Sequence, residues 1–181
     1  HPALVNYLDS RAIDTSIAKK FCREVYYSVG ERNYFAIGFR NDYGGWELRS
    51  ERFKGCSTPK HITTIDNDSD KALAFEGFMD FLSYLTIKQN DSTTCNIAVL
   101  NSVANVQKAV PFLARHRSIY TFLDNDDAGR KALSEIERLC PQSKVIDQSD
   151  FYRRHKDLND YLRSQQPRKR VVVKQKRGFK M

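Results

Sequence analysis

The sequence predicts an α/β protein in which a Rossmann-like parallel sheet, covered by helices on both faces, follows a small mixed α+β lobe. Two observations predict this class. From residue 71 onward, short apolar runs alternate with segments of helical periodicity. Residues 24–65 are instead rich in aromatic and β-branched residues, with the turn sequence "NDYGG" among them. We therefore expect a lobe over residues 1–70, a parallel α/β domain over 71–162 and a tail over 163–181.

Residues 3–23 predict two short helices, and Asp14 is the expected N-cap of the second one because its side chain can accept the free N–H groups of the first turn. Strands are expected in "EVYYSV", "NYFAIGF", "GWELRS" and "HITTI", and the polar stretch "DNDSD" at 66–70 is expected to be a hinge. After it come strands in "KALAFEG", "NIAVL", "SIYTFLD" and "KVIDQ", and helices in "FMDFLSYLTIKQ", "SVANVQKAVPFLARH", "DAGRKALSEIERLC" and "HKDLNDYLRS". Pro111 is expected to break the second of these helices into two pieces.

Composition narrows the class of protein. The chain of 181 residues is 40% hydrophobic, enough for a real core, and no apolar run approaches the length of a membrane span. It does not begin with methionine, and we expect a fragment of a longer protein. The cysteines are too far apart for a zinc knuckle, which favours reduced thiols in a cytoplasmic protein; they are Cys22, Cys56, Cys95 and Cys140.

The net charge of +8 comes from the tail. Residues 163–181 contain eight Lys or Arg and no acid, so residues 1–162 carry 22 basic against 22 acidic side chains. A solvated terminus explains such a tail, and attraction to nucleic-acid phosphates is compatible with it.

Acidic side chains follow several of the predicted strands. Glu76 ends the first strand of the α/β unit, Asp124 and Asp126 follow the third, and Asp157 follows the fourth. Functional groups gather at the carboxyl ends of parallel strands, so these acids are expected at one edge of the sheet. Each has a simpler reading as well, since Asp126 or Asp127 could cap a helix and the others could be solvated.

Taken together, the simpler readings weaken. One cap needs one aspartate, and converging carboxylates repel unless a cation lies among them. A hard cation with oxygen ligands, Mg²⁺ or Mn²⁺, would relieve the repulsion. Gly129 stands in the first turn of a helix, where glycine costs about 1 kcal/mol relative to alanine. Close approach of another backbone segment or of a ligand phosphate would explain it.

These motifs resemble a known family. "EGFMD" at 76–80 resembles the glutamate motif of the toprim domain, and "DNDDAG" at 124–129 resembles its DxD motif. "HKDLNDYL" is similar to the third acidic motif of bacterial DnaG-type primases. Upstream, "LVNYLDSRAIDTSIAKKF", "YFAIGFRN" and "FKGCSTPKHI" resemble the lobe that precedes toprim in primase catalytic cores. The chain is most similar to short primases of Bacteroides-type mobile elements, which carry a zinc-binding domain upstream.

The resemblance implies roles for individual residues. Glu76 would be the catalytic glutamate, and Mg²⁺ would be held by Asp124, Asp126, Asp157 and Asp80. Where primases commonly place a further aspartate, this chain has Asn159. Nucleotide or template phosphates would be held by Arg49, Lys54, Lys60, Lys156 and Arg130. Single-stranded DNA would run between the lobes, with aromatic residues as stacking platforms, namely Tyr34, Tyr43 and Trp46; hairpin packing is the alternative for Tyr34.

The function that follows is metal-dependent synthesis of short RNA primers on single-stranded DNA from ribonucleoside triphosphates. The implied partners include a replicative helicase or a mobilisation protein, and the implied location is the bacterial cytoplasm. Two alternatives remain open. The same acids could hydrolyse a phosphodiester as a toprim nuclease, or the chain could be a non-catalytic nucleic-acid-binding adaptor that works through its basic tail.

Overall fold

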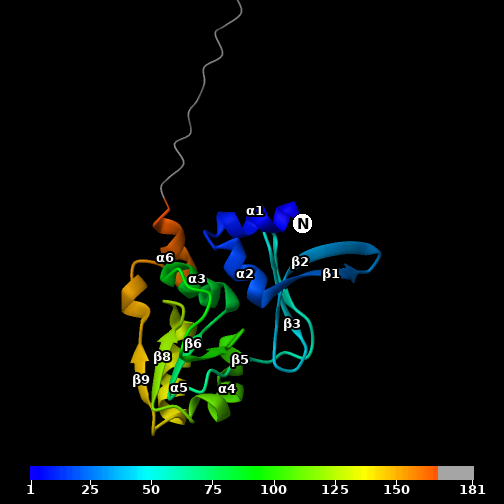
Figure 1. Cartoon of the computed structure of the whole chain (residues 1–181). Coiled ribbons are helices and arrows are strands. Elements are labelled where there is room, and N and C mark those ends of the chain that lie inside the picture. Colours follow the sequence, from blue (N-terminus) through cyan, green and yellow to red (C-terminus); the bar gives the residue numbers. More distant parts are fainter. Residues whose placement is uncertain (167–181) are drawn as a thin grey trace, which may run out of the picture.

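The computed structural model describes residues 1–166 and contains two sheets (Figure 1). The first is antiparallel with strand order β1-β2-β3-β4, and the second has the order β5-β7-β6-β8-β9. Helices lie on both faces of the second sheet, which confirms the predicted α/β fold behind a small mixed lobe. Of the basic tail expected over 163–181, only residues 163–166 belong to the described part of the chain.

The N-terminal lobe contains the expected helices and hairpins. Asp14 caps the second helix as predicted, because its Oδ1 accepts a hydrogen bond of 2.7 Å from the N–H of Ser16. Asn41 closes the "NDYGG" turn by accepting from the N–H groups of Tyr43 and Gly45. The elements of the lobe are α1 (Pro2–Ser10), α2 (Thr15–Phe21), β1 (Cys22–Val29), β2 (Arg32–Arg40), β3 (Trp46–Ser50) and β4 (Phe53–Cys56).

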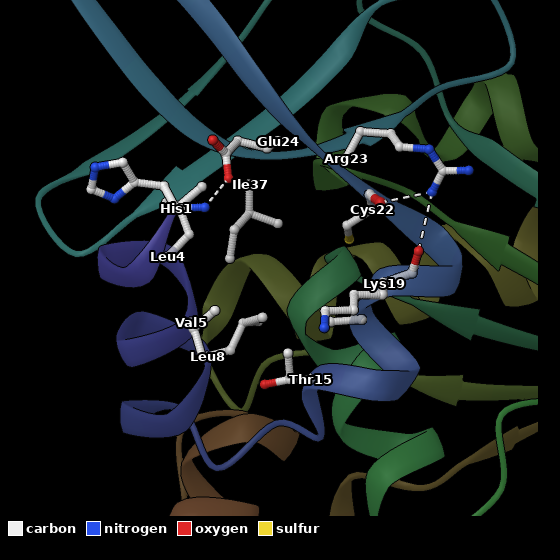
Figure 2. A pocket seen from close by; sticks show the side chains of 11 residues that line it. His1, Leu4, Val5, Leu8, Thr15, Lys19, Cys22, Arg23, Glu24 and Ile37 are labelled. Carbon is white, nitrogen blue, oxygen red and sulfur yellow. Dashed lines mark hydrogen bonds and ion pairs between the residues drawn. The ribbon is translucent and has the colours of Figure 1, made fainter.

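The sequence did not lead us to expect β4, which is short and contains glycine. It pairs antiparallel with β3. On the other side of the lobe, α1 and α2 pack against β1 and leave a cavity of about 140 Å³ (Figure 2). Leu4, Leu8 and Ile37 line it, and Glu24 lies at its rim beside the N-terminal amine.

The second sheet is parallel except for β5, which is antiparallel to β7. Side chains along β6 point alternately to the two faces of the sheet. Leu73 and Phe75 pack in the core under α3 and α6, and Ala72 and Ala74 pack in the core under α4 and α5. The elements are β5 (Thr63–Ile65), β6 (Lys71–Phe75), α3 (Phe78–Lys88), β7 (Asn96–Val99), η1 (Val103–Asn105), α4 (Val106–Leu113), β8 (Ser118–Phe122), α5 (Asp127–Leu139), β9 (Lys144–Asp147), η2 (Ser149–Tyr152) and α6 (Leu158–Ser164).

Three local expectations need correction. The strand in "HITTI" belongs to the second sheet, which therefore begins at Thr63, before the boundary expected at residue 70. The stretch expected to be a hinge is tied down, because the N–H groups of Asn67 and Ser69 both donate to Oδ1 of Asn96. Pro111 lies inside α4 and does not break it. The helix ends at Leu113, so the missing proline N–H costs a single hydrogen bond near its end.

The two lobes share one hydrophobic core. Phe39 of β2 stacks on Phe78 of α3 with ring centroids 5.2 Å apart, and Phe21 of α2 meets Phe81 at 4.9 Å. Polar contacts reinforce the junction, since Nδ2 of Asn159 in α6 donates to the carbonyl of Arg11 at 2.9 Å. Within residues 1–166, no helix has the length and apolar character needed to cross a membrane.

Because the core crosses the junction, we expect urea to unfold residues 1–166 in one transition. Phe39→Ala should lower the free energy of unfolding by about 3–5 kcal/mol, because it removes a fully buried ring. Tyr26→Ala is the matched control on the same sheet; its side chain is 69% exposed, so the change should stay within about 0.5 kcal/mol. Two separate transitions, of which Phe39→Ala shifts one, would contradict a shared core.

Candidate functional site

The edge of the second sheet brings Glu76 and Asp124 together. Glu76 directly follows β6, and its N–H donates to the carbonyl of Phe122 at 3.2 Å. The N–H of Asp124 in turn donates to Oε2 of Glu76 at 3.1 Å. Pairing between β6 and β8 thus continues past their ends and fixes one acidic residue beside the other.

Asp126 and Asp157 lie at the same edge as helix caps. Asp126 caps α5, where Oδ1 accepts 3.0 Å hydrogen bonds from the N–H groups of Ala128 and Gly129, and these bonds hold the pKa of Asp126 below its usual value. Asp157 caps α6 by accepting from the N–H of Asp160 at 2.7 Å. The capping alternative is therefore correct for Asp126, whereas Asp127 is exposed and pairs with Arg130.

Asp80 lies beneath these acids in the first turn of α3. The residue is 8% exposed, and its Oδ1 accepts a hydrogen bond of 3.3 Å from the N–H of Asn159. Burial, reinforced by the nearby charges of Asp157 and Asp124, raises the pKa of Asp80 well above its usual value. Asp80 is thus a buried acid whose surroundings favour its protonated form.

The acids act on one another electrostatically. Burial raises the pKa of Glu76, and the charge of Asp124 raises it further. Burial also raises the pKa of Asp124, with a contribution from Asp157. Asp126 remains the readily ionised member of the set, because backbone N–H groups stabilise its charge.

The positive group at this edge is Lys156. Its Nζ lies 3.3 Å from Oδ2 of Asp124 and 3.9 Å from Oδ2 of Asp126, and the charge of Asp124 raises the pKa of the lysine. We expected Lys156 to hold phosphate and a divalent cation to neutralise the acids; here the lysine neutralises them itself. In the described part of the chain, no group of three His, Cys, Asp or Glu side chains is arranged to hold a metal ion.

The donor set nevertheless has the chemistry that Mg²⁺ or Mn²⁺ prefers, which is several carboxylate oxygens at one point. Asp126 is held ionised, and Asp124 presents Oδ2 toward the same point. The acids therefore fit a hard cation by the type of their donor atoms, and Lys156 lies against two of them, Asp124 and Asp126.

Gly129 is explained by backbone contact. A Cβ atom at this position would lie 2.1 Å from the carbonyl oxygen of Asp124. Of the two explanations expected for this glycine, close approach of another backbone segment is the correct one. The bare Cα allows the start of α5 to pack directly on the loop that carries Asp124.

Sequence analysis missed two residues that shape the site. Asn125 lies between the two aspartates, and its Nδ2 donates to the carbonyls of Tyr152 and His155 at 3.1 and 2.9 Å. The N–H of Asn125 donates to the carbonyl of Lys156 at 2.7 Å, which places the lysine over the acids. Tyr152 is buried and donates its hydroxyl proton to the carbonyl of Leu123. The sequence did contain a signal for Asn125, namely an asparagine placed between the two aspartates of "DND".

The basic residues expected to bind phosphate divide into two groups. Arg49 and Lys54 are cross-strand partners on β3 and β4. Together with Lys60, they surround Glu47, a buried acid that sequence analysis missed; burial raises its pKa, and the three cations oppose the rise. Arg130 instead lies on the exposed side of α5, paired with Asp127.

Arg49 connects this basic group to the acidic edge. Its guanidinium lies over the ring of Phe78 at 5.5 Å, two residues after Glu76, and donates to the carbonyl of Leu48 at 2.9 Å. Burial lowers the pKa of Arg49, and Asp80 is among the acids that oppose this. The N-terminal lobe therefore directs a partly buried cation toward the acids of the second sheet.

Comparison with known proteins assigns the architecture. Residues 73–162 match the family model "Toprim-like", and residues 1–58 match a domain of unknown function, DUF8464. No curated protein matches the chain. The second sheet and its helices are thus a toprim domain, and the protein has the class of fold in which toprim follows a mixed lobe.

Several solved primase structures have a similar fold. The primase fragment of the bacteriophage T7 primase-helicase protein has a TM-score of 0.62 and 19% identity, over 84% of this chain and 66% of that one. The Aquifex aeolicus primase, with zinc-binding and RNA polymerase domains, gives 0.53 and 16% over 88% and 54%. A DNA primase domain from Pseudomonas aeruginosa gives 0.51 and 17% over 89% and 67%. The chain spans about half to two thirds of these structures and shares their fold.

The contact at Gly129 predicts that Gly129→Ala destabilises the protein by about 1–3 kcal/mol, although alanine is the better helix former. The added methyl group must displace the Asp124 backbone or the start of α5. Urea denaturation measures the change, with Ser134→Ala on the exposed side of α5 as the control. A Gly129→Ala variant as stable as the wild type would show that this packing is loose.

Glu47 predicts a pH dependence of stability. Since its pKa is raised in the folded protein, the folded state binds the proton more tightly than the unfolded chain. Its contribution to stability therefore declines as the pH rises from the ordinary value of 4.5 through the raised pKa. The free energy of unfolding of Glu47→Gln, measured at a series of pH values, should decline less over this range than that of the wild type. Parallel curves would mean that Glu47 is solvated.

Proposed function

We propose that the chain is the catalytic core of a DNA primase, which joins ribonucleotides into short RNA primers on single-stranded DNA by nucleotidyl transfer. The observation that carries the proposal is the meeting of Glu76, Asp124 and Asp126 at a sheet edge toward which the first lobe directs Arg49. The primase fragments with the same fold support it. The sequence resemblance to short primases of Bacteroides-type mobile elements suggests that the protein primes replication of such an element.

The proposed reaction forms a bond between a ribose 3′-oxygen and an α-phosphorus and breaks the bond to pyrophosphate. Mg²⁺ or Mn²⁺, when bound, would stabilise negative charge on the phosphoryl oxygens. Asp126 and Asp124 would hold the cation, with Asp157 beside them. Glu76 is suited to accept the hydroxyl proton because burial and Asp124 raise its pKa toward neutrality.

Lys156 has a second use in this reaction. Its side chain is 60% exposed and reaches the acids from the loop before α6. Once Asp124 and Asp126 are neutralised in another way, the ammonium group can turn to the triphosphate of the incoming nucleotide. Lys156 would thus keep the acids together in the empty site and bind phosphate in the filled one.

The basic group of the first lobe would hold the remaining phosphates. Lys54 and Lys60 are exposed, and Arg49 lies deeper, toward the acidic edge. A guanidinium fork grips phosphate oxygens in pairs, whereas lysines act as point charges. The proposed partners are the single-stranded template, ribonucleoside triphosphates and a helicase or mobilisation protein of the same element.

The test is extension of a short RNA annealed to single-stranded DNA, with labelled ribonucleotides and Mg²⁺ or Mn²⁺, so that only nucleotidyl transfer is measured. We expect extension that EDTA abolishes. Asp124→Asn and Glu76→Gln should each slow it on the order of 100-fold or more, because each removes a group from the reacting centre. Asp127→Asn is the matched control, an exposed acid three residues from Asp124 that should leave the rate unchanged.

Other products would identify the alternatives. Metal-dependent shortening of the strands that Asp124→Asn abolishes would make the protein a toprim nuclease. DNA binding without turnover, equal in wild type and Asp124→Asn, would favour the non-catalytic adaptor.

A further inference from the structure

The four-stranded sheet has one face that packs on the rest of the protein and one that does not. On the inner face, Ile37 and Phe39 join the core beneath α1, α2 and α3. Strand alternation turns their neighbours to the opposite side. We call this opposite side the outer face and define it by Tyr27, Arg32, Tyr34, Arg40, Trp46 and Phe53.

Aromatic rings cover the outer face. Tyr27 stacks on its cross-strand partner Tyr34 with centroids 5.6 Å apart and planes at 23°, and its ring lies 5.5 Å from that of Phe53. Trp46 lies against Gly38, where a Cβ atom would stand 2.8 Å from its ring. Beneath the rings, Leu48 is 5% exposed. Tyr27, Tyr34, Phe53 and Trp46 thus lie over the strands on this face.

The rings are not buried by this arrangement. Tyr34 is 40% exposed and Phe53 is 39% exposed. Val29, on the same face at the end of β1, is 60% exposed. Exposed aromatic rings gathered on one face of a sheet are typical of a binding surface.

The charge on the outer face has one sign. Arg32 and Arg40 stand at the two ends of β2, and no outer-face position within the four strands is Asp or Glu. The strand acids Glu24 and Glu47 point to the inner side; Figure 2 shows Glu24 at the cavity under β1, with Arg23 turned toward the end of α2. Exposed rings between arginines match the stacked bases and phosphates of a single strand.

We propose that the outer face binds single-stranded nucleic acid, with bases stacked on Tyr34 and its neighbouring rings and phosphates at Arg32 and Arg40. This rests on the proposed function in that the bound strand would be the primase template. The two arginines are eight positions apart along β2, a span of about 26 Å that accommodates several nucleotides. The template then runs over the outside of the first lobe, not only between the lobes as the sequence suggested for Tyr34 and Trp46. Tyr43 is not part of this face, since it lies in the turn between β2 and β3, where its ring contacts that of His61 with centroids 4.0 Å apart.

The chain has one tryptophan, Trp46, which makes binding at the outer face directly visible. The experiment titrates the full chain with oligo-dT, without metal or nucleotide, and follows both the anisotropy of a labelled oligonucleotide and the fluorescence of Trp46. We expect binding with quenching of Trp46. Tyr34→Ala should weaken binding about tenfold, as loss of one stacked base does. Arg32→Gln should weaken it several-fold and reduce the slope of log K against log salt by about 0.7.

Tyr26→Ala is the matched control, since Tyr26 lies on the same hairpin, is more exposed than Tyr34 and belongs to the inner side. It should bind as the wild type does. Thermal unfolding checks that each variant is folded. If Tyr34→Ala does not fold, Arg32→Gln still tests the proposal, because it changes only an exposed side chain.

Two outcomes would overturn the proposal. Binding that neither quenches Trp46 nor responds to Tyr34→Ala and Arg32→Gln would place the oligonucleotide elsewhere, for example on the lysines and arginines of residues 163–181. Self-association that Tyr34→Ala abolishes, without oligonucleotide binding, would make the outer face a protein interface. Failure of the proposed function is distinguishable, because Asp124→Asn should keep full binding whether or not the wild type extends a primer.

Discussion

The hydrogen bond from the backbone N–H of Asp124 to the carboxylate of Glu76 joins the ends of β6 and β8. This bond holds the side chains of Glu76 and Asp124 close together, and the surrounding groups must reduce the repulsion between them. Burial raises the pKa values of Glu76, Asp124 and Asp80, which favours their protonated forms. Backbone N–H groups stabilise the charge of Asp126, and Lys156 places its ammonium between Asp124 and Asp126. The acidic edge is thus a balanced arrangement before any ligand arrives.

Most of the fold could be predicted from local patterns, because apolar runs of strand length alternate with helical periodicity along the toprim domain. The misplaced elements depend on contacts that a local pattern does not contain. The strand at Thr63–Ile65 reads like part of the first lobe and pairs with β7 instead. Pro111 reads as a break, yet the helix ends soon enough to tolerate it. Pairing with a tertiary neighbour decides the first case, and the place of the proline near the end of its helix decides the second.

The site divides in the same way. The acids could be found because strand ends and helix starts are visible in the sequence, and their spacing carries the family resemblance. Lys156 over the acids and Glu47 among the cations of the first lobe could not be placed, because each depends on how a loop or strand from another part of the chain packs. Gly129 lies between these two cases. The sequence predicted that something approaches this glycine closely, but only the structure identifies the neighbour as the backbone of Asp124.

The ring of Phe39 against Phe78 also bears on what counts as a unit in this protein. Family models divide the chain at about residues 58 and 73, as though two modules had been joined. Physically neither part is autonomous: the toprim half alone would expose the buried faces of Phe78 and Phe81 to water, and the first lobe alone would lose the helix that covers Phe39. If the chain were cut at that border, both pieces would expose apolar surface and would be prone to aggregation. The border between the two family models therefore does not coincide with a border between independently folding units.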